Sequence, residues 1–349
     1  MQIININGVS LESISACVPL KTVNNHEFAK EFMGENMEST IGALGIKERH
    51  VCRLDSATSL DLCIHAAGLI FEKDVRKVDI GAVVFVTLTP DYLMPNNASY
   101  AQHLLGLPQE IPAFDINHAC SGYIYGIWNA GMIAKNLNKK VLLLDGDVNS
   151  HYVSPWDKST GLLFGDAGTA TVISPAGEHE NWSFTFNTDG SKRDAITMKI
   201  GFRNLLNSES LTYKEYEGGN KRRFIDMQME GEAVFKYVVS RVPKIVTDFL
   251  EEKESGPSEF SHLILHQANS FMLRKLARKI GFSFDQMPLS INKFGNTSSA
   301  SIPLTICSEL FSTPRNEVLM VGMGAGLATG VAELNIKNTK IYPLLTVDV

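Results

Sequence analysis

Long apolar runs and paired cysteines are both missing from this 349-residue sequence. No stretch approaches the ~20 apolar residues that a membrane-spanning helix needs, and the first residues lack the basic segment and apolar core of a secretory signal. The five cysteines are odd in number and scattered, without a CxxC pair, which argues against a disulfide framework and a structural zinc site. We therefore expect a cytoplasmic protein with free thiols, no metal site and no membrane contact.

Positively charged residues are also fewer than negatively charged ones. Lys and Arg total 32 against 38 Asp and Glu, so the net charge is −6 and gives no global electrostatic reason to bind nucleic acid. With 44% hydrophobic and 20% charged residues, the composition is that of a globular protein rather than a disordered or fibrous one. The length suits one large domain or two fused ones.

Short β-rich apolar segments alternate with helical patterns along the chain. The strands are predicted at 80–87, 141–144, 261–265 and 318–321. The helices are predicted at 59–71, 120–137, 234–250 and 270–280. This alternation predicts an α/β architecture with largely parallel sheets. The polar stretch 191–221 breaks the rhythm, and we interpret it as an excursion that joins two α/β halves.

Cys120 has the sequence context of a reactive thiol. Within the segment Ala113–Gly122, a predicted strand runs into Cys120 and a predicted helix begins there. A thiol at a helix N-terminus lies beside unpaired amides and the positive end of the helix dipole, so we expect a lowered pKa. Ser121 and Gly122 are small and leave room for a substrate above the sulfur. The alternative is a buried, inert cysteine, which is common in protein cores.

Two further segments carry polar residues suited to catalysis. His262 and His266 are four residues apart, but on a strand that spacing spans ~13 Å, too far for one metal ion. His266, at the end of the strand, is better interpreted as a catalytic imidazole, with a structural histidine as the alternative. Asn296 follows Gly295 in a predicted turn that opens a tightly packed helix, where it offers an amide donor or merely makes the turn.

The glycine-rich segment Gly322–Gly330 follows a predicted strand. A dinucleotide-binding motif would need glycine at position 327, which is Leu327, and too little chain follows for the rest of the unit. A loop of small residues whose backbone N–H groups point at a reacting atom is the better interpretation.

Taken together, these segments resemble the β-ketoacyl-acyl-carrier-protein synthase III family of condensing enzymes. The resemblance covers nearly the whole chain, through Gly45–His50, Thr89–Tyr92, Phe164–Gly168, Thr188–Ser191, Met229–Lys236, His266–Asn269, Gly295–Ser298 and Gly322–Gly330. It implies a thiolase-like αβαβα layered fold made of two similar halves, 1–180 and 181–349, with 190–221 as the irregular excursion. It also implies a homodimer.

The family's Cys-His-Asn triad falls on Cys120, His266 and Asn296. The resemblance implies that Cys120 is acylated by a thioester, and that His266 and Asn296 then stabilise the enolate of a malonyl thioester as it loses CO₂. The oxyanion of the condensation step would be held by the backbone N–H groups of Cys120 and Ala325. Substrate contacts are expected at Met94, Phe235, Asn269, Gly324 and Gly326, with Met94 reaching across the dimer into the partner's acyl pocket.

The same resemblance separates two kinds of acyl donor. Where the family holds the adenine of coenzyme A between a Trp and an Arg, this chain has Ser39 and Ala43, and a pantetheine-contacting Asn falls on Glu232. A basic cluster is expected to dock an acidic acyl carrier protein, although a solvated face is the plain alternative: Lys236, Arg274, Lys275, Arg278 and Lys279. Acyl thioesters of the carrier protein or of coenzyme A are the expected substrates, and no cofactor is expected.

Other activities on this scaffold fit less well. A thiolase would have a second Cys in 322–330, an elongating ketosynthase would have His in place of Asn296, and a plant-type polyketide synthase would have His-Pro-Gly-Gly after the strand that ends at Leu265. Two alternatives stay open. One is an acyltransferase that forms an ester or amide without a carbon–carbon bond, and the other is an inactive partner subunit.

Overall fold

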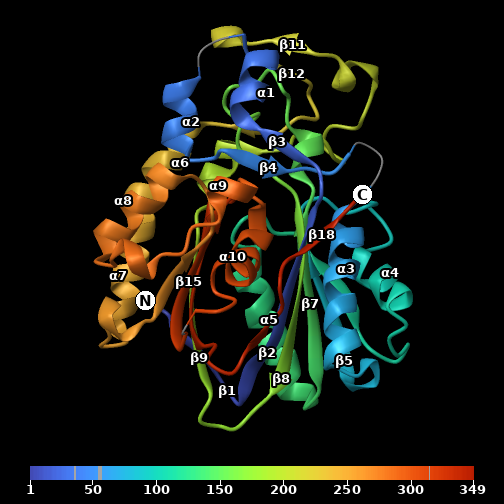
Figure 1. The fold of residues 1–349 in the computed structure, drawn as a ribbon, viewed down its shortest axis with the longest axis vertical. Coiled ribbons are helices and arrows are strands. Elements are labelled where there is room, and N and C mark those ends of the chain that lie inside the picture. The colour runs from blue at the N-terminus through green and yellow to red at the C-terminus, as the bar shows by residue number, and fades with distance from the viewer. Residues whose placement is uncertain (35–36, 54–56, 314) are drawn as a thin grey trace.

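Two β-sheets face each other in the computed structural model, which describes residues 1–34, 37–53, 57–313 and 315–349 (Figure 1). The seven-stranded sheet has the order β17 (Lys340–Ile341), β2 (Val9–Pro19), β8 (Ala167–Pro175), β7 (Lys140–Asp147), β5 (Ile80–Val86), β6 (Ala113–Ile116), with β18 (Leu345–Val347) also paired to β2. The five-stranded sheet has the order β1 (Ile4–Asn7), β9 (Asn181–Thr188), β16 (Ala328–Asn335), β15 (Glu317–Gly324), β14 (His262–Leu265).

Helices lie between the sheets and on both outer faces, so the elements stack as αβαβα layers (Figure 1). Between the sheets are α5 (Gly122–Leu137) and α10 (Ser301–Glu309). The outer face of the larger sheet is covered by α3 (Ser59–Lys73) and α4 (Asn97–Leu104), and that of the smaller by α7 (Val242–Glu252) and α8 (Ser270–Ile280). The layered order expected from the sequence is therefore confirmed.

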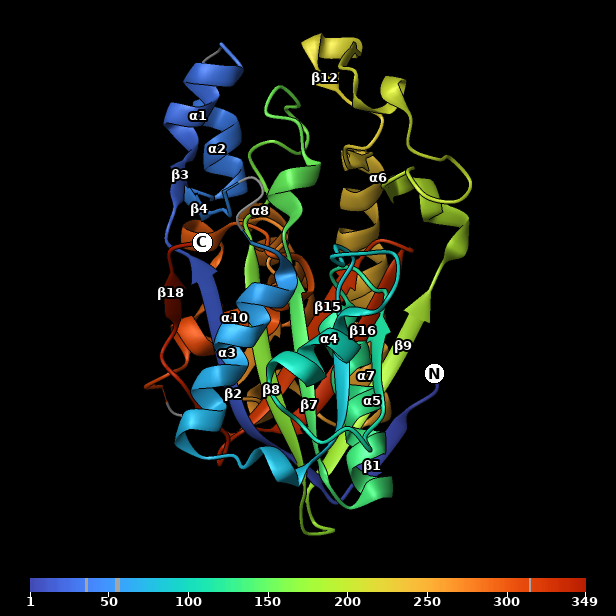
Figure 2. The same cartoon turned by 90° about the vertical axis from the view of Figure 1, so that its right-hand side faces the viewer.

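Shorter elements complete the chain. Two of them, α1 (Asn25–Phe32) and α2 (Glu38–Leu44), lie at the same end of the molecule as the strand β12 (Lys221–Arg222). In Figure 2 the two helices and this strand are on opposite sides of that end. The others are the helices α6 (Gly231–Lys236) and α9 (Ile291–Phe294), the π-turn Tyr237–Arg241, and the strand pairs β3 (Thr22–Asn24) with β4 (Glu48–His50), β10 (Ile196–Thr197) with β13 (Gln228–Met229), and β11 (Lys214–Glu215) with β12 (Lys221–Arg222). Short segments of 3₁₀ helix occur at Lys77–Asp79, Asn149–Tyr152, Gly190–Ala195, Ser208–Leu211, Glu217–Gly219, Pro257–Glu259, Phe284–Gln286 and Ser298–Ala300.

The expectation of largely parallel sheets is wrong, because both sheets are mixed. Strands β5, β6 and β7 run parallel, but β8 runs antiparallel to both β7 and β2, and β16 runs antiparallel to β15 and β9. The glycine-rich loop explains one reversal. Only residues 325–327 separate β15 from β16, and so short a connection joins antiparallel neighbours, whereas parallel strands need a long crossover.

The predicted segments otherwise coincide with elements of the structure. Strand β14 and helix α8 match their predicted ranges almost residue for residue. Helix α3 begins where Thr58 caps it in a capping box with Asp61. Asn269 caps α8 by accepting the N–H of Met272, and Gly281 ends that helix in the left-handed conformation. These local signals are what made the helix boundaries predictable.

Each end of the chain pairs with the sheet that contains mostly strands of the other half. Strand β1, from the start of the chain, pairs with β9 in the five-stranded sheet, whereas β17 and β18, from the end, pair with β2 in the seven-stranded sheet. Each sheet is therefore completed by a segment from the other half of the sequence. The division at residue 180 stays a prediction, and the excursion 190–221 contains only short strands and short helical segments.

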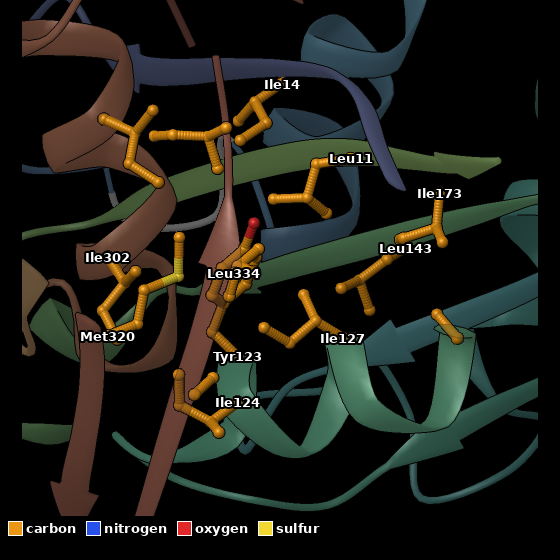
Figure 3. Close-up of a cluster of buried hydrophobic side chains, with 14 of the residues drawn as sticks. Leu11, Ile14, Tyr123, Ile124, Ile127, Leu143, Ile173, Ile302, Met320 and Leu334 are labelled. Atoms are coloured by element: carbon orange, nitrogen blue, oxygen red, sulfur yellow. The ribbon is translucent and has the colours of Figure 1, made fainter. Parts of the chain in front are cut away.

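The core between the sheets explains the unusual composition of α5. Its side chains Tyr123, Ile124 and Ile127 are fully buried and meet residues of both sheets (Figure 3). The partners drawn there are Leu11, Ile14, Leu143 and Ile173 from the larger sheet, Met320 and Leu334 from the smaller, and Ile302 from α10. A helix between two sheets has no solvent face, so it is apolar nearly all round. No helix in the described ranges is long and apolar enough to cross a membrane.

Close packing between α3 and β8 gives a test of this layer. A Cβ atom at Gly168 would lie 2.5 Å from both the Leu62 Cβ and the Cys63 backbone nitrogen, and backbone moves at a high cost. We expect Gly168→Ala to lower the free energy of unfolding by about 1–3 kcal/mol, seen as a lower Tm in calorimetry. Gly68→Ala is the matched control in α3. It meets no atom within 4 Å and should be neutral or stabilising by roughly 0.5–1 kcal/mol. Equal Tm values for the two variants would contradict this packing.

Candidate active site

Cys120 lies at the junction between β6 and α5, as predicted. It comes two residues before the first residue of α5, and it is half-buried, whereas Cys17, Cys52, Cys63 and Cys307 are buried. Cys120 also lines a large cavity, whereas the other four cysteines do not line it. Of the five thiols, Cys120 is therefore the one that a substrate in this cavity meets.

The expected low pKa of this thiol is wrong. Burial raises the pKa of Cys120 to about 12, and the nearby carboxylates of Asp147 and Asp145 push it in the same direction. The Ser298 hydroxyl and the backbone N–H of Cys120 itself favour the thiolate, but by less. Loss of water around the sulfur outweighs these two hydrogen bonds, so the resting group is a neutral thiol.

His266 follows the last residue of β14, and its backbone N–H donates to the Val321 carbonyl on the neighbouring strand. Its Nδ1 lies 2.8 Å from the Ser301 Oγ and 3.1 Å from the Ser298 carbonyl oxygen. Burial lowers the pKa of His266 to about 4, so the imidazole is neutral at physiological pH. The Ser298 carbonyl can only accept, so a hydrogen bond to it places the proton on Nδ1, whereas a bond donated by the Ser301 hydroxyl to Nδ1 places it on Nε2, where it is available to a ligand in the cavity.

Asn296 is held by backbone and side chain together. Its N–H donates to the Leu163 carbonyl at 2.8 Å, and its carbonyl accepts from the Gly165 N–H. Its side-chain Oδ1 accepts the N–H of Ser298 at 2.9 Å. Because the oxygen of the amide is engaged, the NH₂ end is the donor left for a ligand.

Ser298 connects all three residues of the predicted triad. Its N–H binds Asn296, its carbonyl lies against His266, and its Oγ lies 3.8 Å from the Cys120 sulfur. It adopts φ +55°, a left-handed conformation uncommon for a residue with a side chain. The sequence analysis missed this residue, although it ends the Gly295–Ser298 segment. Nothing in the residue type signals that one serine will contact three partners.

The glycine-rich loop lies directly over Cys120. A Cβ at Gly324 would lie 2.6 Å from the Cys120 Cβ and 3.1 Å from its sulfur, so only glycine leaves the thiol accessible. Gly324, Ala325 and Gly326 all line the cavity. The oxyanion role of the Ala325 N–H stays a prediction.

The cavity has a volume of about 720 Å³. The predicted site residues on its wall are Cys120, Asn269, His266, Asn296, Gly324, Ala325 and Gly326. Sequence reasoning missed five methionines that also line it: Met198, Met227, Met229, Met272 and Met323. They come from distant segments, so no local pattern could have grouped them. Methionine side chains are flexible and fill irregular apolar space, so this wall suits an acyl chain.

Two predicted substrate contacts lie elsewhere. Met94 is 84% exposed and does not line this cavity, so its role in a partner's pocket stays a prediction. Phe235, on α6, is outside the cavity wall and stacks on Phe271 of α8 at a centroid distance of 5.9 Å.

The predicted docking residues gather on the outer face of α6 and α8. All five are exposed, and none has a carboxylate partner within the described ranges: Lys236, Arg274, Lys275, Arg278 and Lys279. The Lys275 ammonium lies over the rings of Phe235 and Phe271, at 5.2 and 5.7 Å. Ser39 and Ala43 are exposed on α2 and do not reach the cavity.

The raised pKa of Cys120 can be measured directly. We expect the ultraviolet absorbance of its thiolate, taken as wild type minus Cys120→Ala, to be absent at about pH 8.5, where an ordinary cysteine is half ionised. The band should appear only as the pH approaches about 12, because burial disfavours the charged sulfur. A thiolate already formed near neutral pH would show that the helix N-terminus outweighs burial.

Comparisons with known proteins place this geometry in a family. Family models described as 3-oxoacyl-[acyl-carrier-protein] synthase III and as its C-terminal part match residues 114–190 and 250–336. The β-ketoacyl-[acyl-carrier-protein] synthase III of Streptococcus pneumoniae (strain Hungary19A-6) is 31% identical over 333 residues, which cover 93% of this chain and 98% of the relative.

Solved structures agree with the sequence comparison. A 3-oxoacyl-(acyl-carrier protein) synthase from Burkholderia xenovorans LB400 superposes with a TM-score of 0.89 at 29% identity, over 99% of each chain. The priming β-ketosynthase of the R1128 polyketide pathway has a TM-score of 0.83 at 21% identity, over 95% of this chain and 96% of that one, which is a likeness of fold. The fold is thus thiolase-like, and the chain belongs to the β-ketoacyl-acyl-carrier-protein synthase III family of condensing enzymes.

Proposed function

We propose that the protein acylates Cys120 from a thioester and then condenses the acyl group with a malonyl thioester, with loss of CO₂. The observation that carries this proposal is the convergence on Ser298. One thiol and two neutral hydrogen-bond donors, from three distant segments, are held around one residue on the wall of an apolar cavity.

The chemistry follows from the charges of the groups. Cys120 attacks the acyl thioester and keeps the acyl group as a covalent thioester. A malonyl thioester then binds with its carbonyl oxygen toward His266 and Asn296. As CO₂ leaves, negative charge develops on that oxygen, and the two donors stabilise it more in the transition state than in the ground state. The enolate carbon attacks the acyl-Cys120 carbonyl, and the backbone N–H groups of Cys120 and Ala325 are the proposed oxyanion hole.

A neutral imidazole fits this role better than a charged one. The malonyl carboxylate must leave as CO₂, and a buried imidazolium beside it would stabilise the carboxylate of the ground state. The low pKa of His266 keeps it a neutral donor at physiological pH. Transfer of an acyl group to an alcohol or amine involves no enolate, so the arrangement favours condensation over the acyltransferase alternative.

We also propose a homodimer formed along β6. This strand is at the edge of the seven-stranded sheet, and the neighbouring loop exposes three large side chains, Tyr92 at 67%, Leu93 at 81% and Met94 at 84%. An unpaired sheet edge beside exposed apolar side chains is typical of an interface. A second copy would cover these residues and place Met94 where the resemblance puts it, and light scattering should give twice the mass of one chain.

The roles of His266 and Asn296 can be separated from that of Cys120. We expect His266→Ala and Asn296→Ala to keep self-acylation, measured by intact mass, because their proposed hydrogen bonds stabilise the enolate of the later condensation step. Release of labelled CO₂ from a malonyl thioester should fall ~10²–10³-fold, the usual cost of one lost oxyanion donor. The Cys120→Ala variant should show no acyl adduct. Decarboxylation at wild-type rates in both donor variants would exclude the proposed roles.

The acyl donor is proposed to be a carrier protein rather than coenzyme A. Ser39 and Ala43 offer neither a ring nor a cation to an adenine, whereas the five cations on α6 and α8 face solvent and have no carboxylate partner among the described residues. We expect kcat/KM for an acyl-carrier protein to exceed that for the same acyl-coenzyme A tenfold, which is ~1.4 kcal/mol. Salt should reduce this advantage, because exposed charges are screened over ~8 Å at physiological ionic strength.

A pair of charge reversals tests the docking face. The double variant Arg274→Glu, Arg278→Glu should lower kcat/KM for the acyl-carrier protein and leave kcat/KM for acyl-coenzyme A nearly unchanged. The control is Lys337→Glu, which reverses an exposed charge outside α6 and α8 and should change neither value. Equal use of both donors without salt dependence would count against docking at this face.

A further inference from the structure

One polar side chain on the wall of the cavity has no part in the mechanism above. Asn149 lines the same cavity as Cys120, and it is fully buried. Neither the Oδ1 nor the Nδ2 of its side-chain amide has a hydrogen-bond partner within the described ranges. Buried polar groups in folded proteins are nearly always paired, so an amide that lies beside a cavity with both ends unpaired requires an explanation.

Asn149 differs in this respect from other polar residues of the wall. The Tyr237 hydroxyl pairs with the Thr329 Oγ1 at 2.9 Å, and the Asn269 Oδ1 accepts the N–H of Met272 at 2.9 Å. Several buried side chains in the described part of the chain have a polar atom without a partner, but of these only Asn149 belongs to the cavity wall. The unpaired amide and the cavity therefore coincide at one residue.

The neighbours of Asn149 fix its position. It begins a short 3₁₀ segment just after the end of β7. Before it, the Val148 N–H donates to the Thr89 Oγ1 at 3.0 Å. After it, the N–H and the hydroxyl of Ser150 both donate to the Asp166 carboxylate, at 3.0 and 2.5 Å. With both neighbours bound, the backbone at Asn149 is held in place, so its buried amide stays at the cavity wall.

A further contact places Asn149 on the side of the cavity where Cys120 lies. Asp147, two residues before Asn149, accepts from the Ser299 hydroxyl at 3.2 Å. The residue before Ser299 is Ser298, whose Oγ lies 3.8 Å from the Cys120 sulfur. An acyl chain attached to this sulfur therefore starts close to the segment that carries Asn149.

The wall around Asn149 is apolar and lies away from the mouth of the cavity. Leu88 and Phe164 also line the cavity, and hydrogen bonds from the residues beside Asn149 tie it to both of their segments. The wall residues Tyr92 and Leu93, by contrast, are exposed and belong to the mouth. An apolar wall with a few placed polar groups is the usual form of a ligand pocket, and these polar groups orient the ligand.

The chemistry of the amide indicates which ligand group fits it. The Nδ2 donates hydrogen bonds and the Oδ1 accepts them. A hydroxyl group can pair with either end, whereas a ketone oxygen can pair only with the Nδ2 and a methylene with neither. A plain alkyl chain against Asn149 would displace water from the amide and return no hydrogen bond, which disfavours its binding.

We propose that Asn149 binds a hydroxyl group on the acyl chain, so that the acyl donor of this enzyme is a hydroxyacyl thioester. This inference rests on the proposed function, in which Cys120 carries the acyl group, and it adds the chemical class of that group. Asn149 contacts the substrate without taking part in bond formation and is therefore a specificity residue. The methionines of the wall accept the apolar remainder of the chain.

The test is single-turnover acylation of the full chain by N-acetylcysteamine thioesters, which are small donors that need no docking face. The donors are octanoyl and its 3-hydroxy, 6-hydroxy and 8-hydroxy derivatives, which place the oxygen at different depths, and intact mass gives each rate. We expect at least one hydroxylated donor to react about tenfold faster than octanoyl, because a site built to bond a hydroxyl discriminates against a chain without it. Octanoyl reacting as fast as all three would overturn the proposal.

Asn149→Leu assigns the preference to this side chain. Leucine has a similar volume and no polar atom, so octanoyl should react faster than with the wild type and the preference for a hydroxyl should be lost. The matched control is Asn117→Leu, the same change at an exposed residue of the same wall, which should keep the wild-type preference. A preference that persists in Asn149→Leu would contradict the assignment.

The stability of the free protein gives a second readout. Asn149→Leu removes two buried, unpaired polar atoms, so its Tm should equal or exceed that of the wild type. A lower Tm with an unchanged preference would identify a purely structural asparagine and overturn the proposal. If Asn149→Leu folds poorly, Asn149→Ala, with a smaller side chain, should show the same loss of preference.

The same experiment separates this inference from the proposed function. Wild-type protein that gains no acyl group on Cys120 from any of these donors would refute the proposed function. Acylation of Cys120 without a preference for a hydroxyl would refute only the role of Asn149.

Discussion

The active site depends on the left-handed conformation of Ser298. A residue with φ near +55° turns its N–H, carbonyl and side chain in three directions that a helical or extended residue would not combine. Here these groups meet Asn296, His266 and Cys120. The strain of this conformation is small beside the cost of aligning three side chains from separate elements. The packed layers on both sides of the following helix, α10, hold the residue in place.

Burial determines the protonation states at this site. The same removal of water raises the pKa of the Cys120 thiol to about 12 and lowers that of His266 to about 4, because it disfavours the charged form of each. For His266, the lowered pKa keeps the imidazole neutral, which is the form proposed to donate a hydrogen bond to the enolate. For Cys120, burial favours the neutral thiol, which is a weaker nucleophile than the thiolate. Burial at the wall of a cavity of about 720 Å³ therefore leaves a less reactive resting thiol.

The surface around the cavity has a different physical character. The chain is acidic as a whole, yet five cations gather on α6 and α8 beside the aromatic rings of Phe235 and Phe271. Exposed charges of this kind act on encounter and orientation more than on tight binding. The proposed selection of the donor at the surface and the chemistry at the sulfur therefore depend on separate parts of the structure, which meet at Asn269, the residue that caps α8.

Much of this protein was accessible from the sequence. The period of the hydrophobic residues and the capping residues located β14, α3 and α8 closely, because these signals are local. The order of the motifs along the chain predicted Cys120, His266 and Asn296, because it depends on the residue types that the chemistry requires. Four features could not be predicted from the sequence, because each depends on which distant segments become neighbours. They are the antiparallel strands, the terminal strands that pair in the sheet of the other half, the five methionines of the cavity wall and the contacts that converge on Ser298. The pKa of Cys120 belongs to the second group as well. Its position at a helix N-terminus can be read from the sequence, but the loss of water and the carboxylates behind it exist only in the folded chain, and they decide the sign of the shift.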